Sequence, residues 1–478
     1  MNEAMAFVIA TPLLGAMVAA VFPRQSHWLG VLSLILNAVA VGLLLAFTLS
    51  QGKSTMVLGG WQEGLGIALH ADALATLMLA LTACVALAVS FYATGYFHNP
   101  RDAARFWPLW LLLVAALNGL FLAGDLFNLY VTLELLGLSA VALTALGGKR
   151  ESIDAALRYL MVGLLGSLGY LAGVAILYTA FGTLDMQQVG DQVAVDPASE
   201  TALVLMTGGL LLKTALFPLH FWLPAAHSNA PAPVSAALSA LVVKAGFYLV
   251  LRLWTEVFPQ AVPEQGALLL GVLGSMAILW GSWQALRAQR LKLLAAYSTV
   301  AQLGYLFVGL ALLVITPAGA AHDLVFGAIV LMALTHGFAK SSLFLAIGVV
   351  QQHAGHDRID HLDGTSQRLP ATTFAIALAG VALIGLPPSG AFLGKWHLIS
   401  TSINGGQWLL VLVMGIGSLL AAAYIFRVLG HAFGEAAFAS RPVNNASAEW
   451  PALTLGIIAT LGLGLGSAWV WPFLGGAA

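Results

Sequence analysis

Charged side chains are scarce in this sequence. Only 8% of its 478 residues are Asp, Glu, Lys or Arg, whereas 60% are hydrophobic. A soluble globular domain carries about 25% charged residues, so this composition excludes an ordinary soluble protein. It indicates instead a chain that lipid surrounds along most of its length.

Other features are missing as well. The net charge is −1 and the basic residues never cluster beyond adjacent pairs, which argues against a nucleic-acid partner. The only cysteine, Cys84, cannot form an intrachain disulfide, and we expect it to pack as a small hydrophobic side chain within its apolar run. The first residues lack the positive region that opens a signal peptide, so residues 4–21 are expected to remain as a membrane span.

Signatures of enzyme active sites are also missing. The sequence has no phosphate-binding glycine loop and no nucleophile triad, so we expect neither a cofactor nor a catalytic site of its own. His353, His356 and His361 superficially resemble a metal-ligand spacing, but their polar segment contains no cysteine, and we predict no metal there. A transport protein is the class that remains.

Apolar runs are what the sequence has in abundance. One crossing of a bilayer takes about 20 residues, and fourteen sufficiently long runs begin near Ala4, Leu29, Ala71, Phe106, Leu126, Ile153, Thr201, Val234, Gly266, Leu291, Leu324, Thr372, Trp408 and Ala452. The sequence therefore predicts an all-α polytopic membrane protein. Because the connectors are short, residues 1–478 are expected to form a single membrane domain, with helices 1–3 in residues 1–100 and helix 14 in residues 450–475.

Lysine and arginine are distributed unevenly between the two sides of these helices. The connectors after odd-numbered helices hold Arg24, Arg101, Arg105, Lys149, Arg150, Arg287, Arg290, Arg358, Arg368, Arg427 and Arg441. The connectors after even-numbered helices hold only Lys53 and Arg252. Because positive loops tend to stay in the cytoplasm, both termini are expected on the non-cytoplasmic side.

Two segments indicate internal repetition. Residues 130–137 (YVTLELLG) and 297–304 (YSTVAQLG), five helices apart, share Tyr, Thr, Leu and Gly in register. A five-helix repeat must enter the membrane in opposite orientations, as in many transporters; the alternative is chance matching in an apolar sequence. Prolines break the helices at the same place in each copy, at Pro218 and Pro387. The freed carbonyl groups must be bound by protein or water, which indicates a wet interior path.

Five charged side chains are expected deep in the membrane: Glu134, Lys213, Lys244, Lys340 and Lys395. Intramembrane charges are costly and usually line a path for ions or protons. The alternative is a static ion pair between Glu134 and one lysine, but one carboxylate cannot neutralise four lysines. We therefore predict a chain of groups that exchange protons.

Polar neighbours extend this chain. His336 lies four residues before Lys340 and hence on the same helical face, and His220 follows Lys213 across the predicted break. Histidine titrates near neutral pH and can pass on a proton; a packing role is the alternative, and we favour it for His397. Three further polar side chains are expected to hold water along the path: Ser298, Thr299 and Gln302. For the two hydroxyls, the alternative is a hydrogen bond to the backbone of their own helix.

Several segments carry specific motifs that together span nearly the whole chain. They are FPLHFWLP at 217–224 with AHSNAPAPVSA at 226–236, the helix around Glu134, LAAYSTVAQLGY at 294–305, HGFAKSSLF at 336–344 and GLPPSGAFLGK at 385–395. With these motifs the chain resembles the antiporter-like subunits that are shared by respiratory complex I, the multi-subunit Mrp cation/proton antiporters and membrane-bound hydrogenases.

The resemblance implies a fold and a set of roles. Two inverted five-helix repeats, helices 4–8 and 9–13, would occupy residues 103–255 and 264–433. Glu134 and Lys213 would form a switching pair, and the remaining members of the proton path would be Lys244, His336, Lys340 and Lys395. The implied partners are other membrane subunits in a bacterial inner membrane, and the transported ions are protons, with Na⁺ as a second candidate.

The subfamily is less sharply indicated by the same residues. Lys395 and residues 149–159 and 243–252 are more similar to Mrp D-type subunits, whereas His220 and residues 226–231 resemble complex I and hydrogenase members more. An Mrp-type antiporter subunit is the main hypothesis, and a proton-pumping subunit of a complex I-like NADH-quinone oxidoreductase or hydrogenase is the alternative. Two hypotheses of other classes compete with these. One is an independent permease, which would need a midplane pocket with few titratable groups, and the other is a purely structural subunit.

Overall fold

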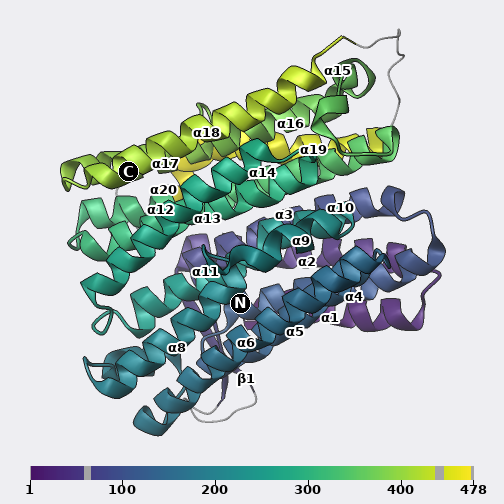
Figure 1. Ribbon diagram of the computed structural model, residues 1–478. Coiled ribbons are helices and arrows are strands. Elements are labelled where there is room, and N and C mark those ends of the chain that lie inside the picture. Colours follow the sequence, from purple (N-terminus) through teal and green to yellow (C-terminus); the bar gives the residue numbers. More distant parts are fainter. Residues whose placement is uncertain (1, 59–65, 436–445, 475–478) are drawn as a thin grey trace. The chain divides into compact units, whose positions relative to one another are not determined.

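A computed structural model describes residues 2–58, 66–435 and 446–474 of the protein (Figure 1). Within these residues, 13 helical segments are long and apolar enough to cross a membrane, and each coincides with a predicted apolar run. The run near Thr372 corresponds to the shorter apolar helix α16 (Pro370–Ile384), which α17 (Gly390–Asn404) follows after a break. The predicted α-helical polytopic membrane protein is confirmed, while the number of crossings stays a prediction. Arg441 and residue 475 lie outside the described residues.

The described residues form two compact units. Unit 1 comprises Met1–Leu87, Phe97–Ala215 and Leu241–Gly266, and unit 2 comprises Ala88–Tyr96, Leu216–Ala240 and Ala267–Ala478. Helix α3 (Ala73–Tyr96) and the π-helical segment η2 (Leu238–Val242) contribute residues to both units. The single membrane domain and the two repeats stay predictions.

Unit 1 consists mainly of long helices. Besides its part of α3, it contains α1 (Asn2–Val21), α2 (Ser26–Gln51), β1 (Ser54–Leu58), β2 (Ile67–Ala71), α4 (Pro100–Leu122), α5 (Leu126–Ala145), α6 (Arg150–Phe181), α7 (Met186–Gln192), α8 (Pro197–Thr214), α11 (Val243–Arg252) and the π-helical η3 (Leu253–Val257). Helix α1 packs against α2 and α4, α5 contacts α4 and α6, and α6 runs along α8 (Figure 1). Aspartates cap α5, α7 and α8 with side-chain oxygens that accept backbone N–H groups: Asp125, Asp185 and Asp196.

Two buried asparagines in unit 1 bind a backbone carbonyl that a proline leaves without its helical partner. Pro12 lies inside α1 and has no N–H group, so the carbonyl of Val8 lacks its usual partner within the helix. The side-chain amides of Asn37 on α2 and Asn118 on α4 each donate a hydrogen bond to this carbonyl at 2.8 Å. Both asparagines are completely buried. Polar side chains on neighbouring helices thus satisfy a backbone group that lipid could not.

Unit 2 is built around one long helix. Besides its parts of α3 and η2 and all but the first three residues of α12 (Glu264–Arg287), it contains η1 (Leu219–Trp222), α9 (Leu223–Asn229), α10 (Ala232–Ala237), α13 (Leu291–Ile315), α14 (Ala320–Ala354), η4 (Ile359–His361), α15 (Thr365–Arg368), α16, α17, α18 (Trp408–Ala432), α19 (Ala446–Ile457), η5 (Ile458–Gly462) and α20 (Leu463–Phe473). Helix α14 has 35 residues, and α10, α13, α16, α17 and α19 all pack against it. Its middle portion is buried on every side.

Both predicted helix breaks are present. Helix α8 ends at Thr214, where Ala215 adopts a left-handed conformation with φ of 54°, and a 3₁₀ turn and α9 follow Pro218. In unit 2, α16 ends at Ile384, where Gly385 follows with φ of 83°, and α17 begins after Pro387. In both places the chain leaves its helix before the proline, as the missing N–H group requires.

A short β-hairpin accompanies the helices of unit 1. Strands β1 and β2 pair antiparallel between α2 and α3, with Ser54 opposite Ala71 and Val57 opposite Ala68. Each strand has only five residues. A run this short next to long apolar helices gives no separate periodic signal in the sequence, which is why the hairpin could not be predicted.

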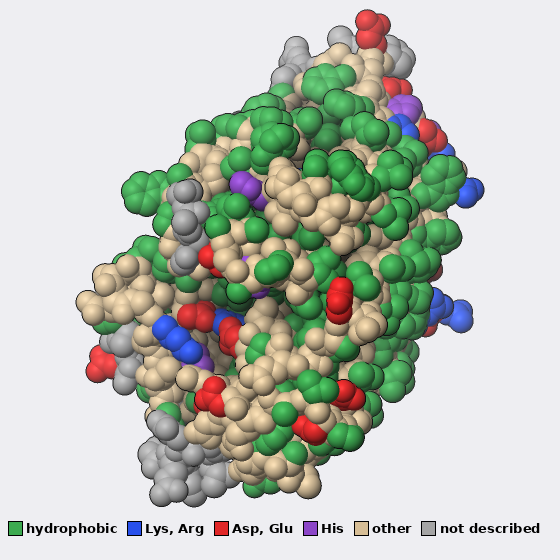
Figure 2. Space-filling view, turned by 90° about the vertical axis from the view of Figure 1, so that its left-hand side faces the viewer, with side chains coloured by type: hydrophobic (Ala, Val, Ile, Leu, Met, Phe, Trp, Pro, Cys, Tyr) green, Lys and Arg blue, Asp and Glu red, His purple; other side chains and the backbone are tan. Residues whose placement is uncertain are grey.

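Large apolar side chains cover much of the surface. Figure 2 shows many hydrophobic side chains on the face that it views, with charged side chains at several separate places. Leu168, Leu419 and Trp469 are among the exposed ones, as expected for helices in lipid. Cys84 is exposed too, so its predicted packing is wrong. In a membrane helix both the lipid face and the packed face are apolar, and hydrophobicity alone does not distinguish them.

Candidate functional site

Glu134 and Lys213 lie together in unit 1. Glu134 projects from α5 and Lys213 from the last turn of α8, and the lysine Nζ lies 3.1 Å from Oε1 of the carboxylate. The lysine side chain is 9% exposed and the glutamate side chain 20%. Glycines make room for the lysine, because a Cβ added to Gly166 would lie 3.2 Å from its Cγ and one on Gly137 would lie 3.6 Å from its Nζ. The structure thus brings this predicted pair into a direct, largely buried contact.

A small cavity borders the ion pair. Its volume is about 20 Å³, which is enough for about one water molecule. Its lining includes Glu134, Lys213, Tyr159, Gly137, Gly163 and Gly246. A water molecule could therefore reach both charged groups within unit 1.

Lys244 is the third predicted residue in unit 1. It is completely buried on α11, and this helix packs closely on α8, since a Cβ on Gly246 would lie 2.7 Å from the Thr214 methyl group. Burying the flexible side chain of lysine is costly unless polar groups surround its amine.

Lys340 is completely buried in unit 2. Its Nζ donates hydrogen bonds to the backbone carbonyl of Ala295, at 2.8 Å, and to the Ser298 hydroxyl, both on α13. His336 is buried one turn earlier on α14. Ser298 thus binds the predicted lysine and also its own helix, at the Ala295 carbonyl. Thr299 bonds to the Ser239 hydroxyl at 2.8 Å.

Lys395 binds the break between α16 and α17. Its Nζ donates to the carbonyl of Ile384 at 2.9 Å and to the Ser418 hydroxyl at 3.1 Å, and it lies 4.1 Å from the centre of the Tyr305 ring. Gln302 donates to the neighbouring freed carbonyl of Leu383 at 2.8 Å. The carbonyl groups that the break releases are therefore bound by two predicted path residues.

His220 lines a pocket of unit 2. This pocket has a volume of about 600 Å³ and lies at the break after α8, with Pro218, Trp280, Arg290 and Tyr297 also in its lining. The His220 ring stacks on Phe217 with 5.4 Å between centroids. His397, for which we favoured packing, contacts the Trp471 ring at 4.9 Å.

The predicted residues thus fall into two groups. Unit 1 holds Glu134, Lys213 and Lys244, and unit 2 holds His220, Ser298, Thr299, Gln302, His336, Lys340 and Lys395. Within each unit, the structure shows direct contacts for Glu134 with Lys213 and for Lys340 with Ser298. A continuous path through all of them stays a prediction.

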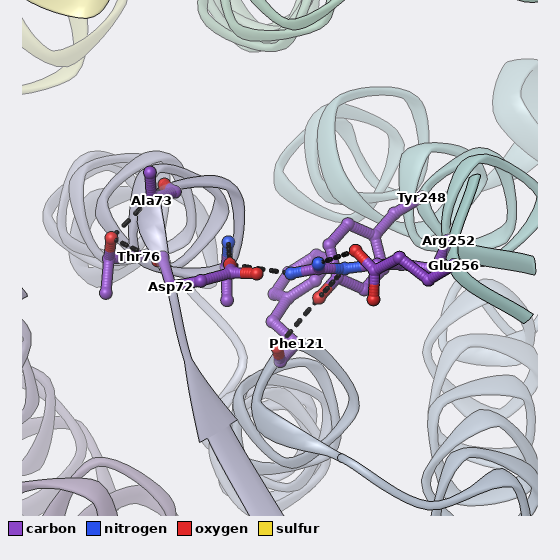
Figure 3. Close-up of polar contacts among 8 residues, drawn as sticks. Asp72, Ala73, Thr76, Phe121, Tyr248, Arg252 and Glu256 are labelled. Carbon is purple, nitrogen blue, oxygen red and sulfur yellow. Dashed lines mark hydrogen bonds and ion pairs between the residues drawn. The ribbon is translucent and has the colours of Figure 1, made fainter. Parts of the chain in front are cut away.

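A third basic centre in unit 1 was not predicted. Arg252, assigned to a connector, lies inside the helical segment Ala232–Val257 and is buried. Its guanidinium contacts two carboxylates, Asp72 at 2.6 Å and Glu256 one turn on (Figure 3). Burial by itself opposes ionisation of Asp72, but the charge and hydrogen bond of Arg252 outweigh it, so the pKa of Asp72 lies below its ordinary value. The sequence does contain a signal for this centre, because Lys244, Tyr248, Arg252 and Glu256 are spaced four residues apart and therefore share a helical face.

Two further buried charges were also overlooked. Lys292 donates to the carbonyl of Ala230, at the end of α9, at 2.7 Å. Glu449 on α19 accepts hydrogen bonds from the N–H group and the hydroxyl of Thr372, at 2.8 and 2.7 Å. Both residues lie at the ends of apolar runs, where hydropathy alone predicts solvent exposure.

Comparison with known proteins identifies relatives along the whole chain. Residues 123–421 match the family described as NADH:quinone oxidoreductase/Mrp antiporter, transmembrane region. The chain is 38% identical to the N-type subunit of the NADH-quinone oxidoreductase of Desulforudis audaxviator, in an alignment that covers 96% of this chain and 94% of the relative. It is 29% identical to the D-type subunit of the Na⁺/H⁺ antiporter of Bacillus subtilis, with 100% and 97% covered.

Solved structures show the same architecture. A chain of the Mrp complex from Dietzia sp. DQ12-45-1b superimposes with a TM-score of 0.89 at 24% identity, covering 99% of this chain and 97% of that one. A chain of the membrane-bound sulfane sulfur reductase, an archaeal respiratory membrane complex, gives 0.90 at 28% identity, with 99% and 96% covered.

Proposed function

The chain belongs to the NADH:quinone oxidoreductase/Mrp antiporter family, and on this premise we propose that it is a proton-translocating subunit of a multi-subunit membrane complex. The observation that carries the proposal is the largely buried contact between Glu134 and Lys213 beside a water-sized cavity. Its partners are other membrane subunits, as in the complexes that contain the similar structures.

The proposed mechanism is electrostatic switching. While Glu134 is ionised next to Lys213, it favours the ammonium form of the lysine and holds the proton there. When the pair separates, the ammonium loses this stabilisation and can pass its proton to the next group. We propose Lys244, His336, Lys340 and Lys395 as the later groups, with His220 at the water-accessible side of the path. Partner subunits supply the driving force by moving the pair apart or together.

Single and double substitutions test the switch. In membrane vesicles that contain the whole complex, Glu134→Gln and Lys213→Met are each expected to abolish proton transport. Each single variant leaves a buried charge without its partner, which costs about 3–5 kcal/mol and can impair assembly. The double variant removes both charges and is expected to assemble normally but still not transport.

A matched control lies on the same helix as the lysine. Glu200 is an exposed carboxylate in the first turn of α8, and Glu200→Gln is expected to behave like the unaltered protein. If the double variant transports protons at the normal rate, the pair is only a structural link and the switching mechanism is wrong. Normal transport in all the variants would favour a structural subunit.

Two kinds of complex are candidates for this subunit. A monovalent cation/proton antiporter of the Mrp type is our main proposal, supported by full-length similarity to an antiporter subunit of the D type. A redox-driven pump is the second, because the identity to the N-type subunit of a NADH-quinone oxidoreductase is higher, at 38%. Vesicles that contain the complex discriminate between them: an antiporter moves protons when a Na⁺ or K⁺ gradient is imposed, whereas a pump needs electron donor and quinone.

We also propose that both termini lie on the non-cytoplasmic side of a bacterial inner membrane. The uneven distribution of lysine and arginine supports this orientation. Glu3 is exposed near the N-terminus. In a Cys84→Ala background, the thiol that Glu3→Cys introduces is expected to react with a membrane-impermeant reagent added to spheroplasts. Protection of this thiol until the cells are lysed would reverse the orientation.

A further inference from the structure

One face of residues 244–256, the part of the Ala232–Val257 segment that lies in unit 1, carries polar side chains at regular intervals. Lys244, Tyr248, Arg252 and Glu256 follow one another every four residues and therefore share a face. Lys244 at one end is completely buried. The side chain of Glu256 at the other end is 43% exposed. The face thus leads from a buried proton-path residue to the surface of unit 1.

Hydrogen bonds connect the outer part of this face. The Tyr248 hydroxyl donates to the backbone carbonyl of Phe121 at 2.9 Å and accepts from Nε of Arg252 at 3.0 Å. The two terminal nitrogens of the same guanidinium contact Asp72 and Glu256 (Figure 3). Arginine remains charged at any ordinary pH, so its role is to hold these groups in place, and the groups that can exchange protons are the hydroxyl and the carboxylates.

The charges of this cluster do not balance. One guanidinium faces two carboxylates, so the ionised cluster carries a net charge of −1 and can take up one proton. A structural clamp would need only one carboxylate to compensate the buried arginine. Asp72 also accepts the N–H group of Ala75 at 2.8 Å, which further favours its ionised form. Glu256, the more exposed carboxylate, is therefore the group left to accept the proton.

Glu256 lies at the end of its helical span, beside α7, which is not one of the spans. Helix α7 packs on η3 so closely that a Cβ on Gly190 would lie 2.3 Å from the Glu256 carbonyl oxygen. A pocket of about 240 Å³ between α7 and the β-hairpin is lined by His70, Asp185, Asp191 and neighbouring residues. Besides Asp72 and Arg252, the titratable and charged groups around this cluster are Tyr248, His70, Lys53 and Asp185.

We propose that Tyr248, Asp72, Arg252 and Glu256 form a proton outlet of unit 1, which connects Lys244 with the aqueous side at the end of this segment. The inference rests on the proposed function in one respect, that Lys244 carries protons. The Lys244 ammonium gives a proton to the Tyr248 hydroxyl oxygen, as this hydroxyl turns its own proton from the Phe121 carbonyl towards Glu256 and releases it. The Glu256 carboxylate takes up the released proton and passes it to water, and Arg252 and Asp72 hold the two groups in position.

The test compares variants of the whole complex in vesicles in which the pH on the Glu256 side is varied. Glu256→Gln keeps an acceptor for Arg252 but cannot take up a proton, and we expect proton transport to fall on the order of 100-fold, within the range that a positioned acid or base contributes. Glu256→Asp restores a titratable carboxylate and is expected to recover most of the rate. Tyr248→Phe keeps the ring that packs edge-on against Phe121 and is expected to slow transport without impairing assembly.

Glu264→Gln serves as the matched control, because Glu264 is an exposed carboxylate that begins the next helix, α12. It is expected to leave the rate and its pH profile unchanged. Normal transport in Glu256→Gln, with Glu134→Gln inactive, would overturn the outlet and leave the proposed function intact. Loss of transport in Glu256→Gln that Glu256→Asp does not recover would also overturn it, since a clamp would then explain the loss. Normal transport in both Glu134→Gln and Glu256→Gln would contradict the proposed function itself.

Discussion

Replacing Gly209 with alanine is expected to push α8 away from α6 and to weaken the contact between Lys213 and Glu134. Gly209 of α8 and Gly166 of α6 face each other across the closest approach of the two helices. A Cβ on Gly209 would lie 2.2 Å from the Gly166 carbonyl oxygen and 3.0 Å from the N atom of Tyr170. Both of these atoms belong to the backbone of a helix, so neither can turn aside as the end of a side chain could.

The distances set the size of the effect. Ordinary van der Waals contact begins at 3.4 Å, so the helices must separate by about 1 Å, and overpacking of this kind costs about 1–3 kcal/mol. Lys213 lies one turn after Gly209 on the same helix. A similar displacement of its Nζ from Oε1, now 3.1 Å away, would bring the pair to about 4 Å, the limit of an ion pair. We therefore expect both a lower melting temperature and slower proton transport.

The neighbouring residue provides the control. A Cβ on Gly208 would meet nothing within 4 Å, and alanine has the same higher helix propensity at either position. Gly208→Ala is therefore expected to be neutral or slightly stabilising, with normal transport. The assay measures the melting temperature of the purified complex and proton flux in vesicles for both variants. If the two variants have the same melting temperature and the same proton flux, the close approach of α6 and α8 does not position Lys213.

Two predictions concern carboxylates that join distant segments. Glu449→Ala removes the acceptor of the Thr372 N–H group and hydroxyl. Because these buried donors are then left unbound, the free energy of unfolding should fall by about 1–3 kcal/mol. Glu449→Gln keeps an acceptor and is expected to lose less stability in thermal unfolding, whereas equal losses in the two variants would argue against the hydrogen bonds. Asp72→Asn removes the ion pair with Arg252, and because the pKa of Asp72 is depressed below 3.8, the stabilisation is present above that pH and disappears as the pH falls through the lowered pKa. The difference in melting temperature between the two proteins should be present at neutral pH and shrink in acid, and a difference that persists at low pH would exclude the ion pair as its cause.

The sequence was sufficient for the features that depend on long runs. The apolar runs predict the spans because a bilayer requires their length, and Pro218 and Pro387 predict the breaks because proline lacks an N–H group. Lys340 and Lys395 are recognisable as buried because they lie far from either end of their apolar runs. These signals are local and need no knowledge of neighbouring helices.

The missed features depend on contacts between distant segments. Arg252 follows an apolar run and looks like a loop residue, and its partner Asp72 lies 180 residues earlier in the chain. The same holds for Glu449, whose hydrogen-bonded partner Thr372 lies 77 residues earlier. Hydropathy predicts only whether a segment enters the membrane, whereas these charged groups are bound by partners on distant segments of the chain.

Apart from Lys244, the buried basic residues of the two units are bound by different kinds of acceptor. In unit 1, Lys213 and Arg252 contact carboxylates. In unit 2, Lys292, Lys340 and Lys395 donate to backbone carbonyl oxygens. A carboxylate favours the charged form of its partner strongly, so moving it away changes the proton affinity of the lysine.

A carbonyl dipole binds the ammonium form less strongly than a full negative charge, and a neutral amine can still donate a hydrogen bond to it. A lysine on such a carbonyl can lose its proton without losing every partner. This difference favours unit 1 as the part in which proton affinity is switched and unit 2 as the part through which protons are passed on. Ser418→Ala, which removes the hydroxyl next to Lys395, should then alter proton flux in vesicles only slightly, because the carbonyl of Ile384 stays in place in either protonation state.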